Sequence, residues 1–325
     1  MSFVLRRLGF YLAAFFLAAS VNFLLPRLMP GNPIDVLFSQ QNTTLPPEAR
    51  AALIETFGFA SGPLHEQYFA YLKSVFTGDL GYSIRFYPQT VNQVLAYALP
   101  WTVFLAGTAT LLAFAVGSVL GVFAAWRRGG AFDTIVTPLS LALQAIPAVV
   151  IALVALFTFG VALRWLPTSY AYNPSLDPAW TWQYFSSVLY HSLMPVTTLM
   201  VVFVGGYLVT MRNNMIGQLG EDHVVMGTAK GLSEARVRFN YAARNAMLPS
   251  VTSLGLTIGA ILGGSLVTEV VFNYPGLGQT LFIGIVTRDY PLIQGQLLIM
   301  TLATLAANLV VDLVYVFLDP RLRKV

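Results

Sequence analysis

The sequence contains no cysteine and very little charge. Without cysteine, the chain can form neither disulfides nor thiolate metal sites, and it has no cysteine nucleophile. Charged residues make up 10% of the 325 residues, whereas soluble domains usually carry about 25%. Hydrophobic residues make up 56%, so a soluble fold would lack the polar side chains needed to cover its surface.

Motifs for catalysis and nucleotide binding are also missing. The sequence has no G-x-x-x-x-G-K-[ST], so we expect that this chain does not bind ATP itself. It also lacks H-E-x-x-H, G-x-S-x-G and G-x-G-x-x-G. No basic stripe is interleaved with aromatic residues, which argues against a nucleic-acid partner. We therefore predict no catalytic, cofactor-binding or metal-binding residues here.

Long uncharged apolar runs are present, and they predict an all-α polytopic membrane protein with six transmembrane helices, because about 20 apolar residues span a bilayer. The first run, about 8–26, lies within residues 1–28. It is longer than the apolar region of a signal peptide and no A-x-A cleavage pattern follows, which favours a retained helix. The other five lie within a membrane core of residues 101–325. They are predicted at about 101–126, 134–163, 189–211, 248–268 and 291–315.

Orientation follows from the Lys and Arg residues that flank the spans. Most of the eighteen basic residues fall in the segments that would be cytoplasmic if the N-terminus were inside. Both termini are therefore predicted to be cytoplasmic. Residues 29–100 then form a small extracytoplasmic subdomain, with helices expected at 46–58 and 63–78. The aromatic loop at 164–188 is interpreted as an interfacial belt rather than a ligand cage.

Seven charged residues interrupt this apolar chain within residues 221–247, which we call the coupling loop. They are Glu221, Asp222, Lys230, Glu234, Arg236, Arg238 and Arg244. Two short helices fit the stretch, the second capped by Ser233. Gly227 and Gly231 form a small-residue line along which another backbone could approach. The loop is either a solvated positive-inside segment or a docking surface for a soluble partner, and its helical pattern favours docking.

The coupling loop resembles the EAA loop of ABC-importer permeases, which docks into a groove on the nucleotide-binding subunit. The chain as a whole resembles the dipeptide/oligopeptide/nickel permeases of that class. The resemblance lies in these ordered motifs: PGNP (30–33), GDLGYS (78–83), AKGLS (229–233), RNAMLPSVT (244–252), EVVFNYPGLG (269–278), RDYPLIQG (288–295) and DLVYVFLDPR (312–321). Asn32 and His223 depart from the residues common in that family, Asp and Tyr.

The resemblance implies a permease subunit of an ABC importer in the cell membrane, carrying peptides by ATP-driven alternating access. The implied partners are a second permease, two ATPase subunits that hold ATP and Mg, and an extracytoplasmic substrate-binding protein. Nickel complexes or oligosaccharides are alternative substrates. The residues expected to couple to the ATPases are Glu221, Asp222, Ala229, Lys230, Gly231, Leu232, Ser233, Arg244, Asn245 and Pro249.

A proton-coupled transporter is the alternative class, and it would need buried carboxylates in a cavity. Glu269 and Asp312 are the candidates, for which helix–helix hydrogen bonding is the simpler role. Glycines four residues apart in the fifth span indicate tight helix packing, or a position beside the transport path. These are Gly255, Gly259 and Gly263.

Overall fold

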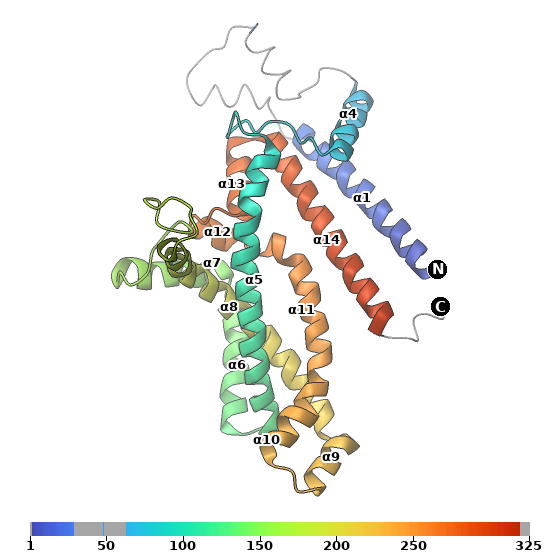
Figure 1. Cartoon of the computed structure of the whole chain (residues 1–325), viewed down its shortest axis with the longest axis vertical. Helices are drawn as coiled ribbons and strands as arrows, with labels where there is room; N and C mark the ends of the chain where they lie inside the picture. The colour runs from blue at the N-terminus through green and yellow to red at the C-terminus, as the bar shows by residue number, and fades with distance from the viewer. Residues whose placement is uncertain (1, 29–47, 49–62, 319–325) are drawn as a thin grey trace. The chain divides into compact units, whose positions relative to one another are not determined.

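The computed structural model describes residues 2–28, 48 and 63–318 (Figure 1). Within these residues every regular element is a helix, and only an isolated bridge joins Tyr82 and Thr90. The predicted all-α fold is confirmed for this part of the chain. The helices are α1 (Ser2–Leu28), α4 (Leu64–Thr77), α5 (Val91–Trp126), α6 (Ala131–Ala145), α7 (Ala148–Ala155), the π-helix η1 (Leu156–Ala162), α8 (Trp182–Leu219), α9 (Asp222–Ala229), α10 (Glu234–Arg236), the π-helix η2 (Val237–Ala243), α11 (Arg244–Gly264), α12 (Leu266–Val271), α13 (Leu277–Thr287) and α14 (Tyr290–Leu318).

Three helices in the described part are long and apolar enough to cross a membrane, namely α1, α5 and α8. The pair formed by α6 and α7–η1 gives a fourth if it counts as one span. Helices α11 and α14 run over 21 and 29 residues. The chain is thus a helical membrane protein, and the number of six spans stays a prediction.

The apolar stretch expected as one span at 134–163 is two helical pieces that meet at 97°. The first piece ends at Ala145 and the second begins at Ala148. Ile146, between them, has φ −75° and ψ 128°, an extended backbone. The ring of Pro147 disfavours a helical backbone at the preceding residue, which explains the break. The stretch is therefore a broken span or a re-entrant hairpin.

The helix predicted at 63–78 is α4, and its end is set by a glycine. Gly78 has φ +73°, and its N–H donates to the Val75 carbonyl at 3.3 Å. Because L-residues avoid this left-handed backbone, glycine is the natural residue at the stop. The other helix expected in this subdomain, at 46–58, lies outside the described residues except for Glu48.

The chain divides into two compact units. The first comprises residues 1–102 and 275–325, and in it α1 packs along α14. Asn22 on α1 donates to the Gln294 carbonyl on α14 at 2.7 Å. A membrane interior offers no water to polar groups, so such bonds are made between helices.

The first unit also joins two of the motifs singled out in the sequence. Ser83, in GDLGYS, donates a hydrogen bond to the Asp289 carboxylate in RDYPLIQG. The Arg85 N–H donates to the same carboxylate oxygen at 2.9 Å. The other Asp289 oxygen accepts the N–H of Leu292 at 3.1 Å, at the start of α14. Asp289 is fully buried, so this motif pair fixes where α14 begins.

The second unit, residues 103–274, is built around α8. Helices α6, α7 and α11 all pack against it. On α5, a Cβ added at Gly117 would lie 2.7 Å from the Val204 carbonyl oxygen, and one at Gly121 would lie 2.6 Å from that of Leu208. Only glycine leaves room for a backbone at that distance, so α5 and α8 touch main chain to main chain.

Candidate functional site

Helix α9 forms the first half of the coupling loop. The Glu221 carbonyl accepts the N–H groups of Val224 at 2.9 Å and Val225 at 3.2 Å, which starts the helix. Val224 is buried, whereas Val225 and Met226 are 57% and 52% exposed. The helix is thus anchored by one apolar side and presents another outward. Val225 and Met226 thus leave apolar surface exposed on an otherwise charged loop.

The turn after α9 depends on Gly231. Its backbone has φ +71°, and its N–H donates to the Thr228 carbonyl at 2.9 Å. The next N–H, of Leu232, donates to the Gly227 carbonyl at 3.3 Å, which closes a Schellman-type helix end. A Cβ added at Gly231 would meet nothing within 4 Å. Glycine is therefore needed here for its backbone, while the space beside it stays open.

Gly227 has a different role from the one expected. It is buried, and an added Cβ would lie 3.5 Å from the Tyr241 ring of the same chain. The predicted small-residue line is therefore wrong at Gly227, because η2 of this chain already covers it. Gly231 alone of the two faces open space.

The second half of the loop begins at Ser233, which occupies the N-cap position of α10. Its carbonyl accepts the Val237 N–H at 3.0 Å. Its side chain makes no capping hydrogen bond, so the predicted hydroxyl cap is not formed. From Glu234 the helix passes through η2 into α11 with no break.

An alanine-rich face holds this second helix to the rest of its unit. Val237 and the small residues around it pack against Val122 and Ala125 on α5 and against two methionines on α8. Alanine allows this close approach at little entropic cost, because it has no rotamers to lose. The buried residues of this contact are Val122, Ala125, Met211, Met215, Val224, Val237, Ala242, Ala243 and Ala246.

Arg238 ties the same helix to the end of α5. Its guanidinium carbon lies 4.8 Å from the centroid of the Phe123 ring and 4.9 Å from that of Phe239. Its Nη1 lies 3.8 Å from Glu234 Oε1, and Trp126 donates its indole N–H to the same oxygen. Stacking on aromatic faces suits the flat guanidinium. Glu234 is therefore a contact within the chain.

The remaining predicted coupling residues lie on the first turns of α11. Arg244 is exposed, and Pro249 is exposed within the helix. Asn245 Nδ2 lies 2.9 Å from His223 Nε2, so it joins α11 to α9. Asn214 on α8 adds a further link through the Ala246 carbonyl, at 3.3 Å. The loop is thus a folded unit rather than an unstructured connection.

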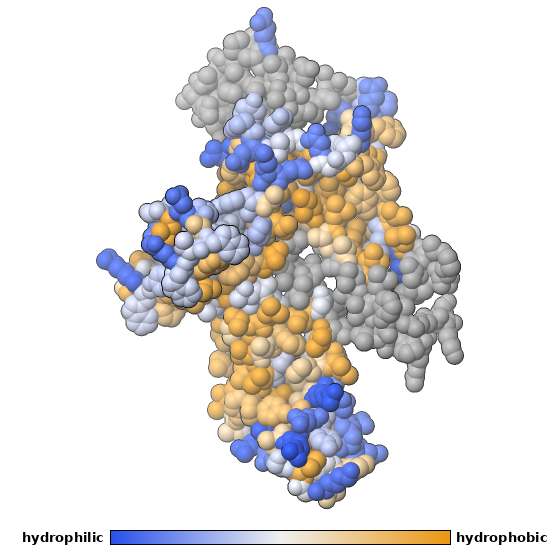
Figure 2. Space-filling model, in the orientation of Figure 1, coloured by the Kyte–Doolittle hydropathy of each residue, from blue (hydrophilic) through white to orange (hydrophobic). Residues whose placement is uncertain are grey.

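The outer surface of the coupling loop combines charge with a shallow apolar hollow. Figure 2 shows hydrophilic residues gathered over α9 and α10, beside an apolar surface on the helices of the same unit. The hollow has a volume of about 390 Å³. It is lined by Leu219, Val224, Val225, Thr228 and Ala229. Burying a charged side chain in lipid is energetically unfavourable, whereas on this exposed loop the charges are solvated. The hollow is a site into which a side chain of another protein could insert.

The other predicted residues lie apart from the loop. Gly255, Gly259 and Gly263 are all on α11, without a described close approach that would decide their role. Glu269 is fully buried and accepts the Ser265 hydroxyl at 2.7 Å, a contact within its own helix, so its predicted bonding to another helix stays a prediction. The side chain of Asp312 lies outside what the structure describes.

Two buried carboxylates were not identified from the sequence. Asp133 on α6 receives Nε and Nη2 of Arg212 on α8 at 2.6 Å and 2.7 Å. Gly129 and Thr137 also donate to Asp133, each at 2.9 Å, so the carboxylate is fully satisfied. The other is Asp289. Arg212, the partner of Asp133, and Ser83, the partner of Asp289, are far from these carboxylates in the sequence. The only local signal was an acidic residue in an apolar stretch.

Comparison with known proteins agrees with this geometry. The family of binding-protein-dependent transport system inner membrane components matches residues 117–324. The chain belongs to this family. It is similar to the di/tripeptide transport system permease protein DppB of Pseudomonas aeruginosa, with 33% identity over 99% of each chain. The oligopeptide transport system permease protein OppB of Haemophilus influenzae is 32% identical over 99% of each chain. A putative peptide permease protein of Brucella suis is 33% identical over 93% of this chain and 92% of its own.

The predicted resemblance to ABC-importer permeases is therefore confirmed. The protein is a membrane-embedded permease component of a binding-protein-dependent transport system. Such a component works as part of a larger complex.

Proposed function

We propose that this permease carries peptides across the cell membrane as one of two permease subunits of an ABC importer. The observation that supports the substrate is the set of similar proteins, three of which are named for peptide, di/tripeptide or oligopeptide transport. Nothing on the chain favours nickel complexes or oligosaccharides over peptides.

Two ATPase subunits would dock on the coupling loop, and they would hold ATP and Mg. The support is the outer face of α9, where Val225 and Met226 are exposed beside an open hollow. Lys230, Gly231 and Ser233 lie on the exposed turn that follows. This side of the loop is free, while Val224 and Gly227 anchor it from within.

ATP-driven closure of the ATPases would move the coupling loop and change the access of the path from one side to the other. Peptide would be delivered by an extracytoplasmic substrate-binding protein. In this arrangement both termini and the coupling loop are cytoplasmic, and residues 29–100 contribute to the outer face. The chain's own part is mechanical: it binds the ATPases and lines a path with little charge.

Uptake and assembly test this proposal together. Cells that express the complete transporter should take up labelled dipeptide, and unlabelled dipeptide or oligopeptide should compete, whereas oligosaccharide should not. The ATPase subunits should co-purify with this chain, and loaded binding protein should raise their ATP hydrolysis. Uptake that persists without ATP and stops with a protonophore would contradict the proposal and favour the proton-coupled class.

A further inference from the structure

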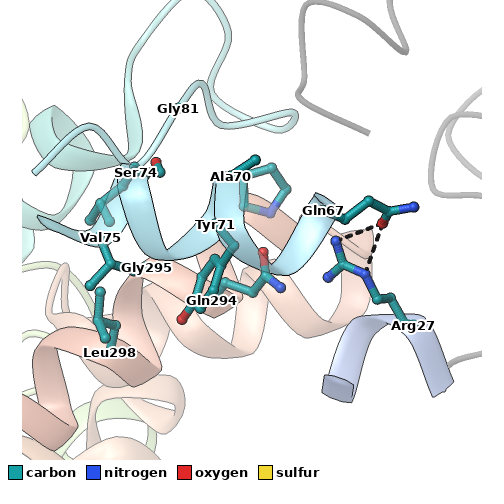
Figure 3. Close-up of a pocket in the computed structure, with 12 residues that line it drawn as sticks. Arg27, Gln67, Ala70, Tyr71, Ser74, Val75, Gly81, Gln294, Gly295 and Leu298 are labelled. Atoms are coloured by element: carbon teal, nitrogen blue, oxygen red, sulfur yellow. Dashed lines mark hydrogen bonds between the residues drawn. The ribbon is translucent and has the colours of Figure 1, made fainter. Parts of the chain in front are cut away.

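A pocket of about 240 Å³ opens within the first unit, between α1, α4 and α14. It lies away from the coupling loop in the sequence and has no part in the proposed docking. Figure 3 shows Arg27 of α1 reaching toward Gln67 of α4 at one end of the pocket. The polar residues that line it are Arg27, Gln67, Tyr71, Ser74 and Gln294.

Uncharged groups hold Arg27 in place. Its Nε and Nη2 donate to the Gln67 side-chain oxygen at 3.1 Å and 3.0 Å, and its Nη1 donates to the Phe23 carbonyl at 2.7 Å. Its guanidinium also lies 3.5 Å from the centroid of the Phe23 ring. All these partners are uncharged, and no carboxylate of the described residues forms an ion pair with Arg27. The guanidinium still has N–H groups to donate to an anion.

The pocket lies beside the end of the apolar part of α1, where a membrane would meet water. The apolar window of α1 runs from Arg6 to Leu25, and Arg27 lies two residues beyond it. This placement holds whichever end of the helix faces the cytoplasm. Helix α4 has no buried residue and leaves apolar side chains in contact with the surroundings. Its Leu64, Phe69 and Phe76 are 61%, 67% and 68% exposed, as in helices that lie in the membrane interface.

We propose that this pocket binds the phosphoryl group of a membrane phospholipid, with Arg27 as the cation. Arginine pairs with phosphate through parallel N–H bonds. The hydrogen bonds to Gln67 already fix the orientation of the Arg27 guanidinium before a phosphate binds. The Tyr71 hydroxyl oxygen accepts Asn22 Nδ2 at 3.3 Å, which leaves its proton to be donated to the ligand. Burial raises the pKa of Tyr71, so the hydroxyl remains a donor at neutral pH. The acyl chains would lie along the exposed apolar residues of α4.

Native mass spectrometry of the full chain, purified in detergent and titrated with phosphatidylglycerol, tests the site. Arg27→Gln removes the cation, and we expect lipid binding about tenfold weaker, as for the loss of a charged hydrogen bond. Gln67→Glu keeps Arg27 but places a carboxylate against it, and the same loss is expected. Lys73→Gln is the matched control, because Lys73 is an exposed cation on α4 outside the pocket.

Lipid binding by Arg27→Gln equal to that of the native chain would overturn the proposal, as would an equal loss in Lys73→Gln. Gln67→Glu guards against the possibility that loss of Arg27 only unfolds the pocket, because it retains the arginine and gives it an internal partner. Inorganic phosphate serves as a competitor that carries the same group without acyl chains. If it displaces the lipid at equal concentration, the site belongs to a soluble anion and the lipid assignment is wrong.

Discussion

Gly231 combines a left-handed backbone, φ +71°, with open space where a side chain would lie. A residue larger than glycine therefore pays a conformational cost but meets no atom of its own chain. If an ATPase subunit occupies that space, a bulky side chain at position 231 would block docking, whereas the backbone strain would act on the folding of the loop. Variants at this position can distinguish them.

We predict that Gly231→Trp leaves membrane levels near normal but abolishes transport and co-purification of the ATPase subunits. Gly231→Ala bears the backbone cost of about 1 kcal/mol without the bulk, and it should retain most assembly. Gly129→Trp is the matched control, since Gly129 has φ +76° and equally open surroundings outside the coupling loop. A pull-down of the ATPases with whole-cell uptake decides the matter. Normal assembly of Gly231→Trp would mean that the loop is only a solvated segment.

The buried pair of Asp133 and Arg212 gives a second prediction. Their side chains are 6% and 20% exposed, so removing one leaves the other without its counter-charge. Asp133→Ala should destabilise the protein by about 3 kcal/mol. Asp133→Leu combined with Arg212→Met removes both charges and should recover most of this loss. Thermal unfolding of the purified protein measures the difference.

The control for this pair is Asp177→Ala, because Asp177 is an exposed carboxylate in the same unit. The Asp177→Ala protein should unfold at the same temperature as the native protein. If Asp133→Ala does so too, the pair contributes orientation only and no stability.

Single residues were predictable where their role depends on neighbours in the sequence. The stops at Gly78 and Gly231 follow from a glycine after a helical pattern, and both have positive φ. Pairs such as Asp133 with Arg212, 79 positions apart, or Ser83 with Asp289, 206 apart, leave no local periodicity. Ser233 was misjudged because a capping residue type does not ensure that its hydroxyl turns to the helix.

At the scale of whole helices, the structure describes close backbone contacts at glycines other than those expected from the sequence. Gly255, Gly259 and Gly263 were expected to pack tightly or to lie beside the transport path, and this stays a prediction. Among the described glycines, Gly205 on α8 approaches the backbone of α6, and Gly117 and Gly121 on α5 approach that of α8. Gly117 and Gly121 are also spaced as G-x-x-x-G, so the signal was present. Spacing alone cannot tell which neighbouring helix a glycine stripe meets.

Helix packing gives a third prediction. A single methyl group at Gly121 would lie 2.6 Å from the Leu208 carbonyl oxygen, so Gly121→Ala must push α5 from α8. We expect a loss of about 1–3 kcal/mol in stability, as for overpacked cores. Gly107→Ala is the matched control, since the same helix offers open space there. Unfolding temperatures of the two variants in detergent check this, and equal values would contradict the packing described.

The bend after α6 has a local signal in the sequence. Pro147 lies within the span predicted at 134–163, and a residue before proline avoids helical backbone. Ile146 shows the expected extended conformation. The size of the bend, 97°, does not follow from a local rule, and both pieces pack against α8.

For the molecule as a whole, the fourth prediction concerns orientation. The excess of Lys and Arg on one side predicts that the coupling loop is cytoplasmic and that the segment before α5 is outside. Because the chain has no cysteine, single cysteines can be introduced without background. Gln89→Cys should react with a membrane-impermeant maleimide in intact cells, and Ser233→Cys only after the membrane is opened. Both side chains are exposed. Labelling of Ser233→Cys in intact cells would reverse the topology.

The unbroken helix from Glu234 through η2 to Gly264 has a consequence for how work crosses the membrane boundary. Residues 234–247 belong to the coupling loop and residues 248–264 to the predicted fifth span, so one continuous helix joins the two. Near its start, this helix is held against its neighbours by the contact of Arg238 with Phe123 on α5 and by the alanine contact with α5 and α8. A displacement of the coupling loop would therefore tilt the helix about this contact. The π-helical segment η2 lies at this contact, so the strain of such a tilt would fall on it.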